Sequence, residues 1–517
     1  MKKLKNQFFS YLTTTLFLMT ASIQSVYADI DEHLSTDNND IEQLENDISP
    51  LKSLANLQSL KHLNQYKSYQ APFVQELPNQ HHVRTLFVST QDLPIVDIQM
   101  TFKAGSAQDE IITSGTFGLS SMAARLMTEG TDQYTAKQII SQFESLGAQF
   151  SVSSYRDMFI VKLRVLSTPN KLQTALELML HVINHATFNN SGLNLVKSNS
   201  KVGQKQILEN PNRLMNIQFY RSLYQKHPYA EPSMGTVSGL SKINPELLKQ
   251  FRNRLLVAQN MNIAITGDLD NSEATDIANT ISNALPQGEK APELPAPSDQ
   301  SDNNIFFRPY NSTQAHVMIG HLGIKRNDPD RVALEVANQI FGGSGFNTIL
   351  MQELRVKRGL TYGAYSNLVT TLSPGFFSYS YSTQQDQLMQ SIQVSHKALV
   401  DFINQPIRKK QLEETKEGLL RSFPMTFSSN ADINAQIGAI GFYDLPADYM
   451  NQYQSKLSKL TLKQVQDAIH KHLRADRLTM VIVASELDQD KLKNMLNQNL
   501  EKENPVNGAL KSTRKSQ

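Results

Sequence analysis

Two histidines four positions apart, His181 and His185, have the spacing in this chain that best suits a metal ion. On a helix they would share one face, where two imidazoles can chelate a divalent cation. The pair lacks the glutamate of helical zinc sites, and it ends a segment with helical apolar spacing, where histidines interact favourably with the helix dipole. The sequences His81-His82 and His470-Lys471-His472 lack helical ligand spacing. We therefore expect structural histidines and no metal site.

Composition excludes several other kinds of chemistry. The 517 residues include no cysteine, so disulfide bonds, thiolate zinc sites and a thiol nucleophile are absent. The formal net charge is +2, and no stripe of Lys and Arg with interleaved aromatic residues occurs, which argues against nucleic acid as a partner. The length leaves room for roughly three or four domains, each with a sizeable core.

The N-terminus has the three parts of an export signal. Lys2, Lys3 and Lys5 form a basic start, Phe8 to Ile23 is mostly apolar, and Val26-Tyr27-Ala28 offers small residues for cleavage. The apolar run is shorter and more polar than the ~20 residues of a membrane-spanning helix. Residues 1–28 are therefore predicted to be a cleaved signal peptide of a periplasmic protein with no membrane span, and an uncleaved anchor is the alternative.

Charge distinguishes the two ends of the exported chain. Residues 29–70 begin with a stretch rich in Asp and Glu and free of Lys and Arg up to Pro50, which predicts an acidic, mobile leader. A calcium loop would need regularly spaced aspartates followed by glycine, and that pattern is missing. Residues 501–517 are predicted to be a polar tail.

A proline-rich segment, residues 286–304, divides two stretches with the same plan. It is expected to be an extended linker between an N-terminal domain at 71–285 and a C-terminal domain at 305–500. Both stretches mix period-2 and period-3.6 patterns, which predicts an α+β unit made twice. The predicted first and last strands of the two units are Pro94–Phe102, Met261–Thr266, Ala315–Gly320 and Leu478–Ala484.

Local signals in the first unit predict a helix followed by a hairpin. Thr135 and Gln138 have the spacing of a capping box, and Gly147 is placed to end the helix. Strands are expected at Phe150–Ser154 and Met158–Val165. The apolar face of this helix is predicted to consist of Ile139, Ile140, Phe143 and Leu146.

Four landmarks in order make the chain resemble the insulinase/pitrilysin family of zinc peptidases over most of residues 75–500. They are Gly118 to Thr131, Asn210-Pro211, His227-Pro228-Tyr229 with Gly235-Thr236, and Phe341-Gly342-Gly343 followed by Leu354 to Tyr362. The resemblance implies two homologous α/β-sandwich halves that close like a clam around a peptide cavity. It does not by itself imply that this chain cuts peptides.

The zinc motif of the family, H-x-x-E-H, is degenerate in this chain. Its two histidine positions hold Ser121 and Arg125, and its glutamate position holds Ala124. The third family ligand is a glutamate on a later helix, and counting back from Asn210-Pro211 places it near Val202-Gly203, in a segment without Asp or Glu. Because every ligand and the general base are missing, we expect no zinc in this chain.

The substrate-holding positions of the family are present. The resemblance implies that Arg355 and Tyr362 bind the peptide chain near the scissile bond, since Arg offers five donors and Tyr one donor on a rigid ring. A surface Arg and a core Tyr without a binding role are the structural alternative.

A chain that keeps Arg355 and Tyr362 without zinc ligands resembles the non-catalytic subunit of heterodimeric peptidases of this family. The expected function is a catalytically silent, substrate-binding subunit, with zinc carried by a partner subunit of the same family. A stand-alone peptide-binding or scaffold protein is the second hypothesis. An active peptidase with an unrecognised site is the third.

Overall fold

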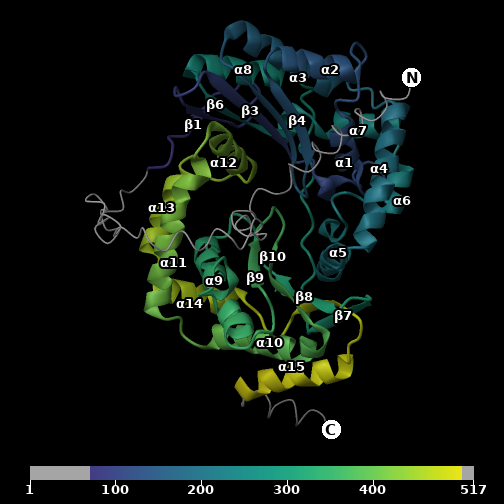
Figure 1. Cartoon of the computed structure of the whole chain (residues 1–517). Helices are drawn as coiled ribbons and strands as arrows, with labels where there is room; N and C mark the ends of the chain where they lie inside the picture. Colours follow the sequence, from purple (N-terminus) through teal and green to yellow (C-terminus); the bar gives the residue numbers. More distant parts are fainter. Residues whose placement is uncertain (1–69, 504–517) are drawn as a thin grey trace, which may run out of the picture. The chain divides into compact units, whose positions relative to one another are not determined.

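Two β-sheets organise the computed structural model, which describes residues 70–503 (Figure 1). Their orders are β1-β2-β6-β3-β5-β4 and β7-β11-β8-β10-β9. The predicted signal peptide, the leader up to residue 69 and the tail beyond Glu503 lie outside the described residues. The strands are β1 (Gln75–Leu77), β2 (Thr85–Ser89), β3 (Ile95–Phe102), β4 (Gln149–Ser154), β5 (Phe159–Leu166), β6 (Met261–Gly267), β7 (Asn304–Pro309), β8 (Gln314–Leu322), β9 (Ala364–Val369), β10 (Phe376–Gln384) and β11 (Thr479–Ala484).

The two sheets repeat one topology. β2 pairs with β6 and β7 pairs with β11 in parallel, and the pairs that follow in each sheet are antiparallel. Only β1 has no counterpart among the described strands of the second sheet. The predicted α+β unit made twice is confirmed.

Helices connect and cover these strands. No helix within residues 70–503 is long and apolar enough to cross a membrane. A π-helix, η6 (Met351–Val356), and short 3-10 turns complete the structure, among them η3 (Ser106–Gln108), η4 (Pro228–Ala230) and η8 (Phe423–Phe427). The α-helices are α1 (Leu119–Leu126), α2 (Ala136–Ser145), α3 (Pro169–His185), α4 (Asn190–Leu208), α5 (Pro211–Tyr224), α6 (Val237–Lys242), α7 (Pro245–Leu255), α8 (Asn271–Ala284), α9 (Arg331–Gly342), α10 (Leu388–Asn404), α11 (Lys409–Ser422), α12 (Asn430–Phe442), α13 (Tyr449–Lys459), α14 (Leu462–His472) and α15 (Gln489–Glu503).

The local signals around α2 were read correctly with one exception. Both hydrogen bonds of the capping box between Thr135 and Gln138 are present. Gly147 has a positive φ of 67° just after the helix, a conformation that favours glycine. The pattern also predicts Ile140 on the apolar face, but this residue is exposed. Of the helix residues, only Ile139 and Phe143 are buried.

Each sheet is covered on one face by a helix from the other half of the chain. α12, from the second half, packs on β3 and β6 of the first sheet (Figure 1). The side-chain amide of Asn434 donates to the carbonyl oxygens of Asp97 and Ala264, at 3.0 and 3.1 Å. A Cβ atom at Gly438 would lie 2.1 Å from the side-chain nitrogen Nε2 of Gln99, so any larger residue would require the Gln99 side chain to move.

The reciprocal contact is made by α5 of the first half. This helix packs on β8 and β11 of the second sheet. Its apolar side chains Met215, Phe219 and Leu223 are buried in one cluster with Met318, Phe376, Val481 and Val483. Each half of the chain therefore completes the core of the other.

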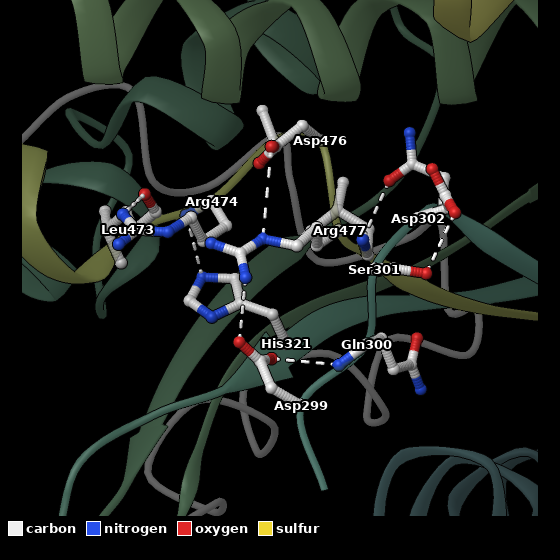
Figure 2. Close-up of polar contacts among 12 residues, drawn as sticks. Asp299, Gln300, Ser301, Asp302, His321, Leu473, Arg474, Asp476 and Arg477 are labelled. Carbon is white, nitrogen blue, oxygen red and sulfur yellow. Dashed lines mark hydrogen bonds and ion pairs between the residues drawn. The ribbon is translucent and has the colours of Figure 1, made fainter.

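The connecting segment between α8 and β7 is extended and firmly attached. The Asp299 carboxylate forms an ion pair with Arg477 at 2.9 Å, and the Gln300 side chain donates to the Ser222 carbonyl oxygen at 3.0 Å. Figure 2 shows this attachment beside the buried His321, whose Nε2 accepts a hydrogen bond from the backbone N–H of Arg474 at 3.2 Å. The proline-rich segment thus contacts both halves along its length.

A buried polar network joins the β4–β5 turn, the β9–β10 turn and the connecting segment. The Asp157 carboxylate accepts hydrogen bonds from the Tyr229 hydroxyl and, at 3.0 Å, from the backbone N–H of Leu372. Burial raises the pKa of Asp157, while these donors lower it. His227 Nδ1 accepts from the Tyr229 N–H at 3.0 Å, so its Nε2 donates to the Pro295 carbonyl oxygen at 2.9 Å. His227-Pro228-Tyr229, a sequence landmark, therefore has a structural role.

The network predicts the effect of removing one hydroxyl group. Tyr229→Phe leaves the buried Asp157 carboxylate with one donor fewer, and such a loss costs about 1–3 kcal/mol. The free energy of unfolding from urea titration should fall by this amount. Tyr155→Phe, at an exposed position of the same turn, is the control and should leave stability unchanged. Equal stability of the two variants would contradict the role of the network.

Candidate functional site

The degenerate zinc helix is α1, and it is anchored from its N-terminal end. Gly118 precedes it with a φ of 103°, and the helix has no side-chain cap of its own. Instead the Asp109 carboxylate accepts from the backbone N–H groups of Gly118 and Ser120, at 2.5 and 2.8 Å. These groups form the positive end of the helix, where a carboxylate is stabilised.

The three zinc-motif positions of α1 carry no metal ligand. Ala124 is buried with a relative exposure of 6%, Ser121 is half-buried, and Arg125 is exposed. Leu119, Met122 and Leu126 are buried in the core of the first half. The helix is therefore held by packing, and its motif positions present a methyl, a hydroxyl and a guanidinium group.

Arg125 identifies the facing position on α4. Its Nη1 donates to the hydroxyl oxygen of Ser200 at 2.8 Å, and Ser200 is buried with an exposure of 9%. Val202, near which the count along the sequence placed the third ligand, is 58% exposed. The α4 residue that faces the motif is therefore Ser200, two positions before Val202.

The predicted histidine pair lies apart from these positions, in the last turn of α3. Asp132, which sequence spacing did not link to the pair, lies beside both histidines. Its carboxylate is 3.4 Å from His181 Nε2 and 3.3 Å from His185 Nδ1. The two rings contact different carboxylate oxygens and stack with centroids 4.6 Å apart. This arrangement is a polar cluster at a helix C-terminus, where burial and the neighbouring His185 lower the pKa of His181.

Within residues 70–503, one group of acidic and histidine side chains is compact enough for a shared ion: Asp328, Asp330 and His472. The Lys471 ammonium already lies 2.6 Å from an Asp330 oxygen, where it supplies the positive charge. His472 Nε2 contacts the same oxygen at 2.9 Å. The cluster belongs to the start of α9 and not to α1.

The predicted Arg-Tyr segment is anchored by its apolar residues and exposes its polar ones. Leu354 and Leu360 are buried, and the Thr361 hydroxyl donates to the Ser382 carbonyl oxygen at 2.6 Å. Arg355 belongs to the π-helix η6, a geometry often found at functional sites. Its guanidinium lies 4.7 Å from the centroid of the Phe346 ring.

Tyr362 is 86% exposed, so the core alternative for this residue is wrong. Neither its hydroxyl nor the Arg355 guanidinium hydrogen-bonds to another described residue, and the structure does not join the two side chains. Three further large apolar side chains of this segment are exposed: Phe346, Val356 and Tyr365. Exposed apolar groups beside unpaired donors are typical of a binding surface.

Comparison with known proteins identifies the family. Residues 84–237 match the family model of insulinase (peptidase family M16), and residues 242–419 match that of the peptidase M16 inactive domain. The crystal structure of a peptidase M16 inactive domain from Pseudomonas fluorescens is similar, with 33% identity and a TM-score of 0.76, covering 80% of this chain and 98% of that one. This chain belongs to peptidase family M16.

Relatives of this M16 homologue differ in what their names say. A non-peptidase homolog from Helicobacter pylori is 25% identical, covering 79% of this chain and 93% of that protein. An uncharacterized zinc protease from Rickettsia felis is 25% identical, covering 71% and 88%. The match to the peptidase M16 inactive domain, together with the missing ligands and base at α1, supports an inactive M16 homologue.

Four residues make contacts that were not predicted from the sequence: Asp109, Ser200, Asp132 and Phe346. Asp109 and Ser200 gave no signal because neither belongs to a motif, and their roles depend on contacts 11 and 75 positions away in sequence. Asp132 follows the Gly118–Thr131 frame directly, but nothing in the sequence linked it to His181 and His185. Phe346 directly follows the glycine-rich loop. A position at the end of such a loop favours an exposed side chain, and this was the available sequence signal for Phe346.

The Arg125–Ser200 contact predicts which substitutions would rebuild a zinc site. The variant with Ser121→His, Ala124→Glu and Arg125→His should hold no zinc after dialysis, because the third ligand is absent. Adding Ser200→Glu should give about one zinc per chain by metal analysis, still without hydrolysis, since outer-shell support is missing. Adding Val202→Glu instead is the matched control and should not restore binding. Equal zinc contents of the two quadruple variants would contradict the assignment of Ser200.

Asp109 predicts a pH dependence of stability. Burial, only partly offset by its hydrogen bonds, raises the pKa of this carboxyl from 3.8 to about 7. Between these values the folded state holds a proton that the unfolded chain has lost, so the contribution of Asp109 to stability falls as the pH rises. One pKa unit corresponds to about 1.4 kcal/mol, so the change is on the order of 4 kcal/mol.

The measurement is the difference in unfolding free energy between the natural protein and Asp109→Asn, taken from about pH 4 to about pH 7. We expect the natural protein to lose stability relative to the variant across this range. A difference that stays constant, or that grows with pH, would show that Asp109 is not buried as a proton-binding group.

Proposed function

We propose that this chain is the catalytically silent, substrate-binding subunit of a periplasmic zinc peptidase. In this proposal a second M16 chain carries the H-x-x-E-H motif and the zinc, and this chain binds no zinc at α1. Its substrates are peptides or unfolded segments of proteins.

The observation that carries the proposal is the placement of Arg125. A guanidinium occupies a ligand position, donates to Ser200 and has no lone pair for a metal. It would also repel a divalent cation electrostatically. Activity at this helix is thus blocked by an added positive charge as well as by missing ligands, while α1 itself stays packed in the core.

Named relatives support a role as a subunit. The Arabidopsis thaliana relative, named a probable mitochondrial-processing peptidase subunit alpha-1, is 20% identical, covering 68% of this chain and 70% of that protein. The Bos taurus relative is named cytochrome b-c1 complex subunit 1. Both names describe chains that work inside assemblies, which favours a partner over a stand-alone scaffold. The export signal predicted at residues 1–28 places the pair in the periplasm.

Arg355 and Tyr362 are the proposed peptide contacts. Both side chains have donors that no described residue uses, and buried Leu354 and Leu360 fix the backbone between them. Fixed donors can hold peptide carbonyl oxygens near the zinc of the partner, and the exposed Phe346, Val356 and Tyr365 offer apolar contacts beside them.

The proposal predicts a loss of turnover without a loss of stability. In the reconstituted pair, Arg355→Ala or Tyr362→Phe should lower the peptidase rate, because misplacement of the substrate costs on the order of a hundredfold. Melting temperature and assembly should stay unchanged, since neither side chain has a polar partner in the described structure. Peptide hydrolysis, thermal unfolding and analytical size exclusion measure the three quantities.

Arg358→Ala is the matched control. Arg358 lies three residues from Arg355 but forms an ion pair with Glu353 at 2.7 Å, so its loss should affect local structure rather than turnover. Unchanged turnover in an assembled Arg355→Ala and Tyr362→Phe complex would refute the peptide contacts. Tightly bound zinc in the purified chain, or peptide hydrolysis by the chain alone, would refute the silent role.

A further inference from the structure

A cavity of about 230 Å³ lies where the two halves and the connecting segment meet. Lys103, Ala107, Gln108 and Asp157 from the first half line one side. Lys325, Arg326, Leu372 and Tyr443 from the second half line the other, and residues 291–294 of the connecting segment close it. The cavity is separate from α1 and from the Arg355–Tyr362 segment.

Arg326, which is half-buried, brings to this cavity a positive charge that forms no ion pair among the described residues. No carboxylate of the described residues lies within ion-pair distance of its guanidinium, which makes one side-chain hydrogen bond, from Nη1 to the Thr370 hydroxyl at 3.3 Å. Its Nε is buried without a hydrogen-bond partner. Burial and the neighbouring Arg331 lower the pKa of Arg326. The nearby Glu335 partly offsets this by raising the pKa of Arg326, although its carboxylate forms its ion pair with Arg331.

The acids that line the cavity are occupied or exposed. Asp157 accepts from the Tyr229 hydroxyl and the Leu372 N–H. Asp444 lies 3.9 Å from Lys103 and 4.0 Å from Arg84, and Glu293 is exposed at the rim. Lys325 has no ion-pair partner among the described residues. Two cations without ion-pair partners among the described residues, the exposed Lys325 and the half-buried Arg326, therefore line the cavity.

We propose that this cavity binds a small organic carboxylate, held by Arg326 and Lys325. A guanidinium fork matches the two oxygens of a carboxylate, and the half-buried Arg326 gains an ion-pair partner. The carboxylate belongs either to a free organic acid or to the C-terminus of a peptide. Such an anion would contact both halves and the connecting segment at once, independently of any partner subunit.

The apolar part of the lining explains why an organic acid fits better than a bare inorganic anion. The methyl of Ala107, the side chains of Leu294 and Leu372, and the ring of Tyr443 surround the charged groups. The Tyr443 ring centroid lies 5.5 Å from the Arg326 guanidinium carbon. Hydrophobic walls with a few placed polar groups are typical of small-molecule sites.

The test is thermal unfolding of the purified protein in a buffer free of carboxylates. Succinate represents the free acid, and N-acetyl-alanyl-leucine represents a peptide C-terminus, with its amide as the uncharged counterpart. Succinate or the free-carboxylate peptide should raise the melting temperature progressively with concentration, and sodium chloride of equal ionic strength should not. An equal response to the amide and the acid, or no response to either acid, would overturn the proposal.

Variants identify the site. Arg326→Met should raise the melting temperature without ligand, since it removes a half-buried charge that has no ion-pair partner among the described residues. It should also weaken the carboxylate response roughly tenfold to a hundredfold. Arg331→Met is the matched control and should lower stability, because it leaves the Glu335 carboxylate unpaired. Ala107→Leu keeps every charge and should abolish the response by filling the cavity. A full carboxylate response in both Arg326→Met and Ala107→Leu would refute the site.

Discussion

The junction of the two halves depends on the buried carboxylate of Asp157. Burial raises its pKa, and the Tyr229 hydroxyl and the Leu372 N–H stabilise the charged form. These two donors come from different halves of the chain, so the carboxylate is satisfied only when both turns meet. Ser373 extends the contact, since its N–H donates to the Tyr229 hydroxyl at 3.2 Å and its hydroxyl to the Pro295 carbonyl oxygen at 3.2 Å. A short polar network thereby fixes the position of the connecting segment.

Helix α12 packs on the first sheet and α5 on the second, so each half of the chain covers a sheet of the other. This packing explains why the alternating pattern of β3 did not predict the burial of its polar face. Strand β3 alternates Val96, Ile98, Met100 and Phe102 with polar Asp97, Gln99 and Thr101, so the strand itself was predictable from its period of two. The same pattern suggests a solvated polar face, yet these polar side chains are buried under α12. The burial depends on Gly438 and Asn434, more than 330 positions away, and a local pattern carries no information about such a partner.

The positions of the zinc motif could be predicted from the sequence because they belong to one continuous segment. The frame around α1 assigned Ser121, Ala124 and Arg125 to one helix, and i, i+3 and i+4 positions of a helix share a face. The third-ligand position on α4 required a count across loops, which gave the region of Val202-Gly203, and the Arg125 guanidinium contacts Ser200 two positions before Val202. The exposure of Tyr362 and the pairing of His181 and His185 with Asp132 depend on tertiary packing, so sequence spacing left them open.

Burial also explains why single substitutions do not rebuild a zinc site at α1. Ala124 is buried beside the core, so Ala124→Glu as the only change would place a carboxylate in an apolar environment without a cation. It would lower the free energy of unfolding by roughly several kcal/mol. A histidine at position 125 alone would lose the hydrogen bond to Ser200 without gaining a metal. Each single substitution therefore destabilises α1 or leaves it without a metal site. The packing of Leu119, Met122 and Leu126 does not depend on which residues occupy the motif positions. The fold around α1 is thus stabilised by apolar packing that does not involve a metal ion. In our proposals the chain binds other molecules at the Arg355–Tyr362 segment and in the Arg326 cavity.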